Sequence, residues 1–265
     1  MKSDNPPLII RDSRSFRNHL PDLRRNDLLV GQMNLKTTEE TLFLYLVEQG
    51  VQFFPSALSQ QLSRSKCLQT FIYADLMVPH TFVARGKYDM IRNIARYGRE
   101  EIGPVITKQN RTNCGLGISR WPSIEDVYNQ VCFGSLQYPF VVQPFLPSFT
   151  DLRIIILADY EEVYCRKNLN SFRNNVLFGG SSQACVLAKK QKDMCAGVMA
   201  KGGFPYAHID LMITPENDIY FSEINLRGGL KGAVITEQEY WQRIERIQEE
   251  FIEEYKLSVK FSASS

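Results

Sequence analysis

The segment HIDLMITPENDIYFSEINLRGG, residues 208–229, carries the residue types and spacing that best fit a chemical role. Apolar and polar residues alternate on both sides of the turn-forming sequence TPEND, and this pattern predicts an antiparallel hairpin. Successive side chains of a strand point to opposite faces, so Asp210, Glu223 and Asn225 are expected to share one face. The hairpin therefore brings two carboxylates and an amide together.

A turn centred on Glu216 and Asn217 sets the register of this hairpin, which places these pairs at opposite positions: Asp210 and Glu223, His208 and Asn225, Met212 and Phe221. Two neighbouring carboxylates repel each other unless a positive charge lies between them. Oxygen ligands without His or Cys suit Mg²⁺, with Mn²⁺ as an alternative ion. A hairpin whose polar face simply lies in solvent is the other interpretation.

The segment ITKQNRTNCGLGIS, residues 106–119, places Lys108 at the end of a predicted strand and follows it with a loop that contains Gly115 and Gly117. Glycines let backbone amides approach an anion closely, and a nearby lysine can neutralise a phosphate. The same pattern also fits an ordinary hairpin loop.

Two further segments can hold parts of a nucleotide or an anionic substrate. The linker QPFLP, residues 143–147, follows an apolar strand and can offer backbone groups to a flat heterocycle, although a plain Pro-rich connection fits equally well. The stretch RKNLNSFRNN, residues 166–175, gathers cationic and amide side chains that can bind phosphate or carboxylate. A solvated charged loop is the alternative for that stretch.

The elements that position these residues alternate between helical and strand patterns, which predicts an α/β protein. The first 58 residues follow a β-α-β order. Short apolar runs separated by turn residues predict strands around each of the segments described above. Helices are predicted over residues 59–74, 88–97, 124–133, 189–201 and 237–255.

The composition excludes several classes of protein. The chain has 265 residues, 44% of them hydrophobic, and a formal net charge of +2, which is too small for bulk attraction to nucleic acid or to a membrane surface. No stretch approaches the roughly 20 apolar residues of a membrane span, so we expect a cytoplasmic protein without nucleic-acid or membrane partners. Three histidines and the absence of nucleophile-elbow, HExxH and Walker A motifs disfavour common hydrolases.

Taken in order, the motifs resemble the ATP-grasp superfamily, in its branch of RimK-like and glutathione-synthetase-like carboxylate-amine ligases. The resemblance runs from about residue 59 to residue 232, roughly two thirds of the chain. The segments similar to the family's motifs are SQQLSRSKCLQTFIYADLMVPHTFV, PVITKQNRTNCGLGI, VVQPFLP, DLRIIIL, CRKNLNSFRNNVLFGG, HIDLMI and EINLRGGLKG.

The resemblance implies an ATP-grasp fold, in which two α/β lobes clamp ATP. A short N-terminal α/β lobe over residues 1–58 would precede them. The two clamping lobes would cover residues 59–140 and residues 141–265, with a C-terminal helix in the second.

The resemblance also implies a role for each residue that matches a motif. The implied assignments are Lys66 and Lys108 on the phosphates with the Gly115 and Gly117 loop, Gln143 and Leu146 around the adenine, Asp151 near the ribose, Asp210, Glu223 and Asn225 on Mg²⁺, Arg166 and Arg173 on the transferring phosphoryl group, Asn175 beside the metal or the substrate, and Arg153 and Arg227 on the substrate.

The implied reaction is ATP-dependent ligation of a carboxylate to an amine through an acyl phosphate, which needs no covalent protein nucleophile. The partners would be ATP, an acid and an amine, the amine being an amino acid, a small metabolite or a peptide or protein tail. An ATP-binding regulatory protein with little turnover and a kinase on the same fold are the alternatives. The identity of the substrates and the oligomeric state stay open at this point.

Overall fold

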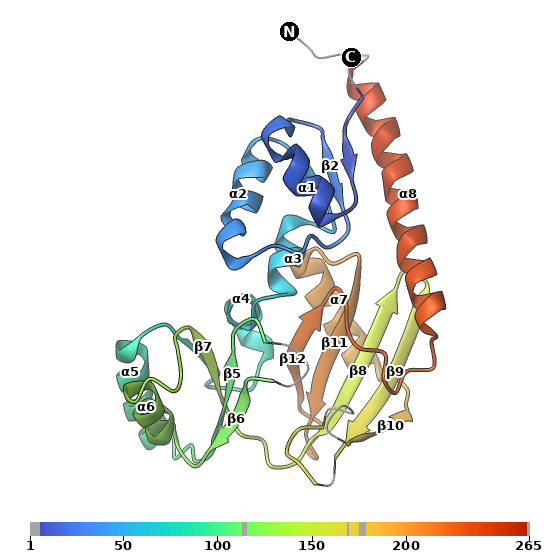
Figure 1. Ribbon diagram of the computed structural model, residues 1–265. Coiled ribbons are helices and arrows are strands. Elements are labelled where there is room, and N and C mark those ends of the chain that lie inside the picture. Colours follow the sequence, from blue (N-terminus) through green and yellow to red (C-terminus); the bar gives the residue numbers. More distant parts are fainter. Residues whose placement is uncertain (1–5, 113–115, 169, 175–178, 264–265) are drawn as a thin grey trace.

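The computed structural model describes residues 6–112, 116–168, 170–174 and 179–263, with side chains described through residue 260. Three sheets follow one another along the chain, and helices pack on each of them (Figure 1). The expectation of an α/β protein is confirmed. The lobe boundaries expected at residues 58 and 140 stay predictions.

The first sheet is parallel, as the β-α-β order of the N-terminal residues predicts. Phe16, Leu29 and Leu46 are fully buried between this sheet and its helices. Its elements are β1 (Ile9–Ile10), α1 (Ser13–His19), η1 (Leu20–Asp22), β2 (Leu28–Val30), η2 (Thr37–Glu39), α2 (Thr41–Glu48) and β3 (Gln52–Phe54).

The second sheet is antiparallel, with strand order β4-β7-β5-β6. Helices α5 and α6 lie together on one side of it, at the left of Figure 1, and bury Met90, Tyr97 and Val127 against Phe140. Its elements are β4 (Phe82–Ala84), α5 (Lys87–Arg99), β5 (Val105–Gln109), β6 (Ile118–Trp121), α6 (Ile124–Cys132) and β7 (Phe140–Pro144).

The third sheet is the largest and is antiparallel, with strand order β10-β9-β8-β11-β12. Its interior strand β11 is buried along almost its whole length, because α7 and α8 contribute apolar side chains to the same core. Its elements are β8 (Thr150–Leu157), β9 (Tyr160–Lys167), β10 (Ser181–Ala184), α7 (Lys189–Gly202), β11 (Tyr206–Ile213), β12 (Ile219–Asn225) and α8 (Glu237–Ala263).

The single helix expected over residues 59–74 is wrong, because the chain forms two helices there. These are α3 (Ala57–Leu62) and α4 (Lys66–Ile72), and the short η3 (Ala74–Leu76) follows them. The Ser65 side chain accepts a hydrogen bond from the Leu68 backbone N–H at 3.1 Å, so Ser65 is the N-cap of α4. The break leaves Ser63 and Arg64 in a turn between the two helices.

The hairpin of β11 and β12 has the expected register at its base and a different one near its turn. Asp210 pairs with Glu223 and His208 with Asn225, as predicted. A β-bulge follows Asp210, so that Leu211 pairs with Phe221 and Met212 with Tyr220, and the expected Met212 and Phe221 pair is wrong. The bulge leaves Ser222 as the extra residue of β12.

Helix α8 is longer than expected and connects the third sheet to the first. It continues past residue 255 to Ala263, and Figure 1 shows it running from the strands of the large sheet to the N-terminal sheet. Ile252 is buried against Leu28 and Val30, and the Phe251 ring stacks on Phe54 with ring centroids 4.0 Å apart. Among the described residues, no helix has the length and apolar content needed to cross a membrane.

Replacement of Ile252 by Ala tests whether this contact holds the N-terminal sheet in place. We expect the free energy of unfolding to fall by about 2 to 5 kcal/mol, because the change empties a fully buried site. Leu257 on the same helix is 56% exposed, so Leu257→Ala is the matched control and should change stability by less than about 0.5 kcal/mol. Urea unfolding followed by circular dichroism measures both, and equal stability of the two variants would contradict the prediction.

Candidate functional site

A cavity of about 870 Å³ lies between the second and third sheets. Strands β5 and β7 line it from one side, and β8, β9, β11 and β12 line it from the other. Residues of the segment 32–37 from the N-terminal region and of the turn between α3 and α4 close one end. A volume of this size is suited to a nucleotide and a second small molecule.

Most of the residues singled out from the sequence meet in this cavity. Gly117 is described but is not among the lining residues, and Gly115 and Asn175 lie outside the described residues. The predicted site residues that line the cavity are Lys66, Lys108, Gln143, Leu146, Asp151, Arg153, Arg166, Arg173, Asp210, Glu223, Asn225 and Arg227.

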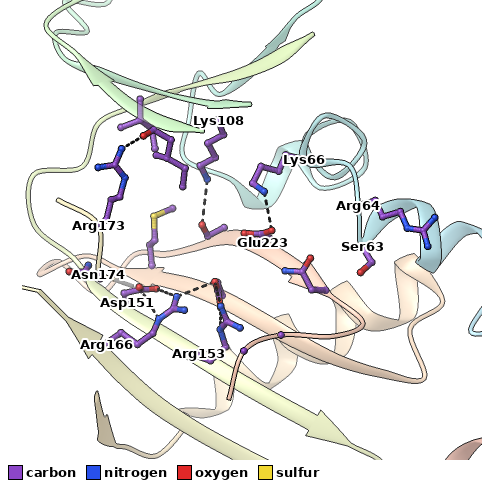
Figure 2. Close-up of a pocket in the computed structure, with 18 of the residues that line it drawn as sticks. Ser63, Arg64, Lys66, Lys108, Asp151, Arg153, Arg166, Arg173, Asn174 and Glu223 are labelled. Atoms are coloured by element: carbon purple, nitrogen blue, oxygen red, sulfur yellow. Dashed lines mark hydrogen bonds and ion pairs between the residues drawn. The ribbon is translucent and has the colours of Figure 1, made fainter. Parts of the chain in front are cut away.

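Lys66, the first residue of α4, points toward β12 and forms an ion pair with Glu223, with Nζ and Oε1 3.2 Å apart (Figure 2). Its ammonium group also donates a hydrogen bond to the backbone carbonyl of Thr112 in the glycine-bearing loop. Lys66 is buried, and the N-cap at Ser65 fixes where its helix begins. The side chain therefore joins this loop, α4 and the hairpin of β11 and β12 at one point.

Lys108 extends from β5 into the same space, and Figure 2 shows it beside Lys66 and also directed toward β12. Its Nζ lies 3.4 Å from the Oγ of Ser222, the extra residue of the bulge. Burial lowers the pKa of Lys108 to about 8, and the Lys66 charge adds to that effect, while Glu223 opposes it. Lys108 is therefore largely protonated at neutral pH but loses its proton more readily than an exposed lysine does.

Two arginines and two aspartates form a buried cluster on the floor of the cavity. Arg166 donates to both oxygens of Asp151, at 2.8 and 3.1 Å, and its Nη2 lies 3.0 Å from Asp210 Oδ2. Arg153 lies opposite Asp210 in the pairing of β8 with β11 and donates from Nη2 to Oδ2 at 3.1 Å. The charges of the four side chains balance, so their burial leaves no net charge without a partner.

The pKa directions within this cluster follow from its geometry. Burial would raise the pKa of Asp210, but the charges of Arg153 and Arg166 outweigh burial and lower it. Burial raises the pKa of Asp151, and the charge of Asp210 adds to the rise against the opposing effect of Arg166. Asp210 is thus the carboxylate that the two guanidinium groups keep ionised.

The far end of the cavity offers apolar and aromatic walls. Gln143 is buried on β7, opposite Ile106 of β5, and Leu146 follows in the linker. The rings of Phe145 and Phe172 lie edge to face with centroids 6.4 Å apart, and the Arg173 guanidinium lies 4.4 Å from the Phe172 centroid. A flat heterocycle can be held between such walls by the polar groups of the linker.

Asp210 on β11 and Glu223 and Asn225 on β12 form the donor set that would hold a hard divalent cation. Asp210 Oδ1 is buried and lies 2.5 Å from Arg153 Nε, yet it accepts no hydrogen bond from the described residues. Glu223 and Asn225 line the same cavity and, with Asp210, supply only oxygen donors on this face. These two carboxylates and one amide supply the oxygen ligands that Mg²⁺ prefers, and in the structure Asp210 and Glu223 are ion-paired with Arg153 and Lys66.

The structure adds cavity residues that the motifs did not reveal. Arg64 lies in the turn between α3 and α4, and Gln32 and Asn34 reach the cavity from the N-terminal region. Gly228 also lines it, and a Cβ atom there would lie 2.5 Å from His208 Nδ1 and 2.6 Å from Arg153 Nη1. Position 228 therefore needs glycine because the loop after β12 packs directly on these two side chains.

A model of the RimK-like ATP-grasp domain matches residues 62–240, which is more than half of the chain and covers every lining residue of the second and third sheets. The chain belongs to the RimK-like ATP-grasp family. The family resemblance seen in the motifs is thereby confirmed. A comparison with curated protein sequences finds no match.

Solved structures of ATP-grasp proteins share this fold. D-cycloserine synthetase DcsG superposes with a TM-score of 0.60 at 12% identity, over 83% of this chain and 84% of its own. D-alanyl-alanine synthetase A from Vibrio cholerae gives 0.57 at 13%, over 84% and 77%. A RiPP-associated ATP-grasp ligase from Chryseobacterium gregarium gives 0.56 at 16%, over 82% and 74%. These likenesses confirm the ATP-grasp fold.

The lowered pKa of Lys108 predicts a pH dependence of nucleotide binding by this RimK-like domain. A bound phosphate favours the charged lysine, so affinity for ADP with Mg²⁺ should be constant below pH 8 and fall by up to about tenfold per pH unit above it. In Lys108→Arg the cation persists, and the fall should disappear. Calorimetric titrations from pH 7 to pH 9 measure this, with Lys192→Arg at the surface as the control.

If Lys108→Arg retained the pH dependence of the unaltered protein, Lys108 would be removed from the nucleotide site.

Proposed function

We propose that this chain is an ATP-dependent ligase that joins a carboxylate to an amine through an acyl phosphate. One observation carries the proposal: two buried lysines, Lys66 and Lys108, converge from separate elements on the oxygen donors of β12. Two cations beside carboxylates across one cavity provide a place where a polyphosphate and a metal ion can meet.

In this proposal the nucleotide lies along the cavity from the linker to the hairpin. Gln143 and Leu146 hold the adenine, and Lys66 and Lys108 neutralise the phosphates. The structure supports this direction because the aromatic walls and the lysines occupy different parts of the same cavity. The nucleotide phosphates would also relieve the repulsion between the two lysines.

Asp210, Glu223 and Asn225 would hold Mg²⁺, which neutralises charge on the phosphates when it is bound. The buried cluster below them then has a positioning role. Arg153 and Arg166 hold the Asp210 carboxylate in place and keep it ionised, and Asp151 fixes Arg166. The ribose contact of Asp151, the phosphoryl contacts of Arg166 and Arg173 and the substrate contact of Arg153 stay predictions.

The reaction proceeds in two steps. A carboxylate oxygen of the acid attacks the γ-phosphorus, the bond from that phosphorus to the bridging oxygen breaks, and ADP leaves with the electron pair. The amine nitrogen then attacks the acyl carbon, the carbon–oxygen bond to the phosphate breaks, and the nitrogen loses a proton as inorganic phosphate leaves. Both steps depend on positioning and charge neutralisation.

The names of the solved relatives agree with this class of reaction. One is a D-alanyl-alanine synthetase, and another was crystallised with ADP and with leader and core peptides. These names suggest amino acids and peptides as the classes of substrate to test with this chain. The acid and amine used by this chain are part of the proposal that the next experiments test.

Release of ADP in the presence of Mg²⁺ should require both an acid and an amine. We expect pooled carboxylic acids together with pooled amino acids to support ADP formation, and either pool alone to give only the background rate. Glu223→Gln should lower the rate about 100-fold or more, because it removes a charged oxygen donor at the phosphates. Glu161→Gln is the control, since Glu161 pairs with Lys192 at the surface.

A coupled assay for ADP measures these rates, and circular dichroism shows that both variants are folded. Nucleotide binding without ADP release would reject the ligase hypothesis in favour of an ATP-binding regulatory protein. Release that needs only one pool, with phosphate found on the acceptor, would favour a kinase. Unchanged turnover in Glu223→Gln would contradict the assignment of the hairpin.

The acyl phosphate itself can be trapped with hydroxylamine. With the active acid present and hydroxylamine in place of the natural amine, we expect a hydroxamate to accumulate at the same rate as ADP. The reason is that hydroxylamine attacks an activated acyl carbon and a free carboxylate does not react with it. Colorimetric detection with Fe³⁺ measures the product, and ADP formed without hydroxamate would exclude an acyl phosphate that is accessible to amines.

A further inference from the structure

The turn between α3 and α4 is fixed against the end of β12. The Ser63 Oγ accepts a hydrogen bond from the Leu226 backbone N–H at 2.9 Å, and Lys66 pairs with Glu223. The two segments therefore run in opposite directions, with residues 63–66 beside residues 223–226. This pairing brings Arg64 and Arg227 to the same end of the cavity, where both are lining residues.

Arg64 and Arg227 differ from three other arginines of the cavity. Arg153 and Arg166 pair with aspartates, and Arg111 pairs with Glu40. Within the described residues, neither Arg64 nor Arg227 forms an ion pair with a carboxylate. The Arg64 Nη1 is buried and has no hydrogen-bond partner there.

The Arg227 guanidinium lies over the ring of Trp241, 4.9 Å from its centroid, which orients it without neutralising it. Burial and the nearby charge of Arg227 lower the pKa of Arg64. Two guanidinium groups that repel each other beside an open cavity form a site for an anion with planar, bidentate geometry.

We infer that Arg64 and Arg227 bind a second carboxylate, one that does not react, on a substrate of the proposed ligase. The inference rests on the proposed function and names the class of its substrate as a dianionic one, such as a dicarboxylic acid. Gln32 and Asn34 also line the cavity, and their side-chain amides can donate hydrogen bonds to that group.

The position along β12 separates this carboxylate from the nucleotide phosphates. Lys108 contacts Ser222 and Lys66 contacts Glu223, whereas Arg227 lies two residues beyond Asn225. Two residues span at most about 7 Å, and less where the chain bends after β12 as it does here, a length comparable to a dicarboxylic acid with a backbone of about four to six carbons. One carboxylate of such an acid can reach the Mg²⁺ donors while the other reaches the arginines.

Trp241 provides a direct readout of this site. The chain has two tryptophans, so in a Trp121→Phe background all tryptophan emission comes from Trp241. Succinate, glutarate and adipate would be titrated in the presence of ADP and Mg²⁺, which fill the phosphate end and leave the arginine end for the added acid. Pentanoate, which has the length of glutarate and one carboxylate, is the matched single anion.

We expect at least one dicarboxylate to bind about tenfold or more tightly than pentanoate. Arg64→Gln and Arg227→Gln should each weaken its binding by about tenfold or more, the scale of a lost charged hydrogen bond. Arg64→Lys should retain part of the affinity. Arg246→Gln is the control, because Arg246 pairs with Asp159 and Glu250 on the surface of α8.

Calorimetry gives the affinity of the Arg227 variant, since Trp241 loses its neighbouring cation there. Thermal unfolding shows that each variant is folded. The inference is overturned if no dicarboxylate binds more tightly than pentanoate, or if both arginine variants bind it as tightly as the Arg246 control.

The binding assay contains no turnover, so its result is separate from that of the ligase assay. Binding of glutarate that depends on Arg64 and Arg227, without acid- and amine-dependent ADP release, would reject the ligase and keep the carboxylate site. Acid- and amine-dependent ADP release with no effect of either arginine on dicarboxylate binding would keep the ligase and reject the carboxylate site.

Discussion

The contact between α4 and the free edge of β12 is the constraint on which the site depends. An edge strand presents unpaired backbone groups, and burying them without partners is costly. Gln69 satisfies both backbone groups of Ile224, because its side-chain amide donates to the Ile224 carbonyl at 2.9 Å and accepts from the Ile224 N–H at 3.1 Å. The Ser63 hydroxyl accepts a hydrogen bond from the Leu226 N–H. The hydrogen bonds that complete the sheet therefore also place Lys66 against Glu223.

The distribution of charge in the cavity follows from this arrangement. Of the described residues that line it, nine are Arg or Lys and three are Asp or Glu, so the cavity is far more cationic than a chain with a net charge of +2. The excess is uneven, because Arg153 and Arg166 are balanced by aspartates on the floor. Lys108, Arg64 and Arg227 contribute to the excess, and they lie where phosphates and carboxylates are proposed to bind.

Sequence patterns predicted the parts of the fold that local rules control. Alternation and turn chemistry placed Asp210 opposite Glu223, but the bulge at Ser222 leaves no mark on that alternation. Several serines near residue 60 could each cap a helix, so the break before α4 was missed, and Arg64 with it. The arginine partners of Asp210 depend on β8 lying beside β11, a neighbour relation between distant strands that no local pattern encodes.

Unbalanced cations have an energetic consequence for the free protein. Burial of Lys108 beside Lys66 costs stability, and the lowered pKa of Lys108 expresses that cost. A bound polyanion removes the repulsion, so part of its binding energy reverses a penalty already present in the folded chain. Ligands that bind only the folded state also stabilise it in proportion to their concentration. A nucleotide and an acid bound as proposed would therefore stabilise the same junction of α4 and β12 that positions them, which would link occupancy of the site to the stability of the fold.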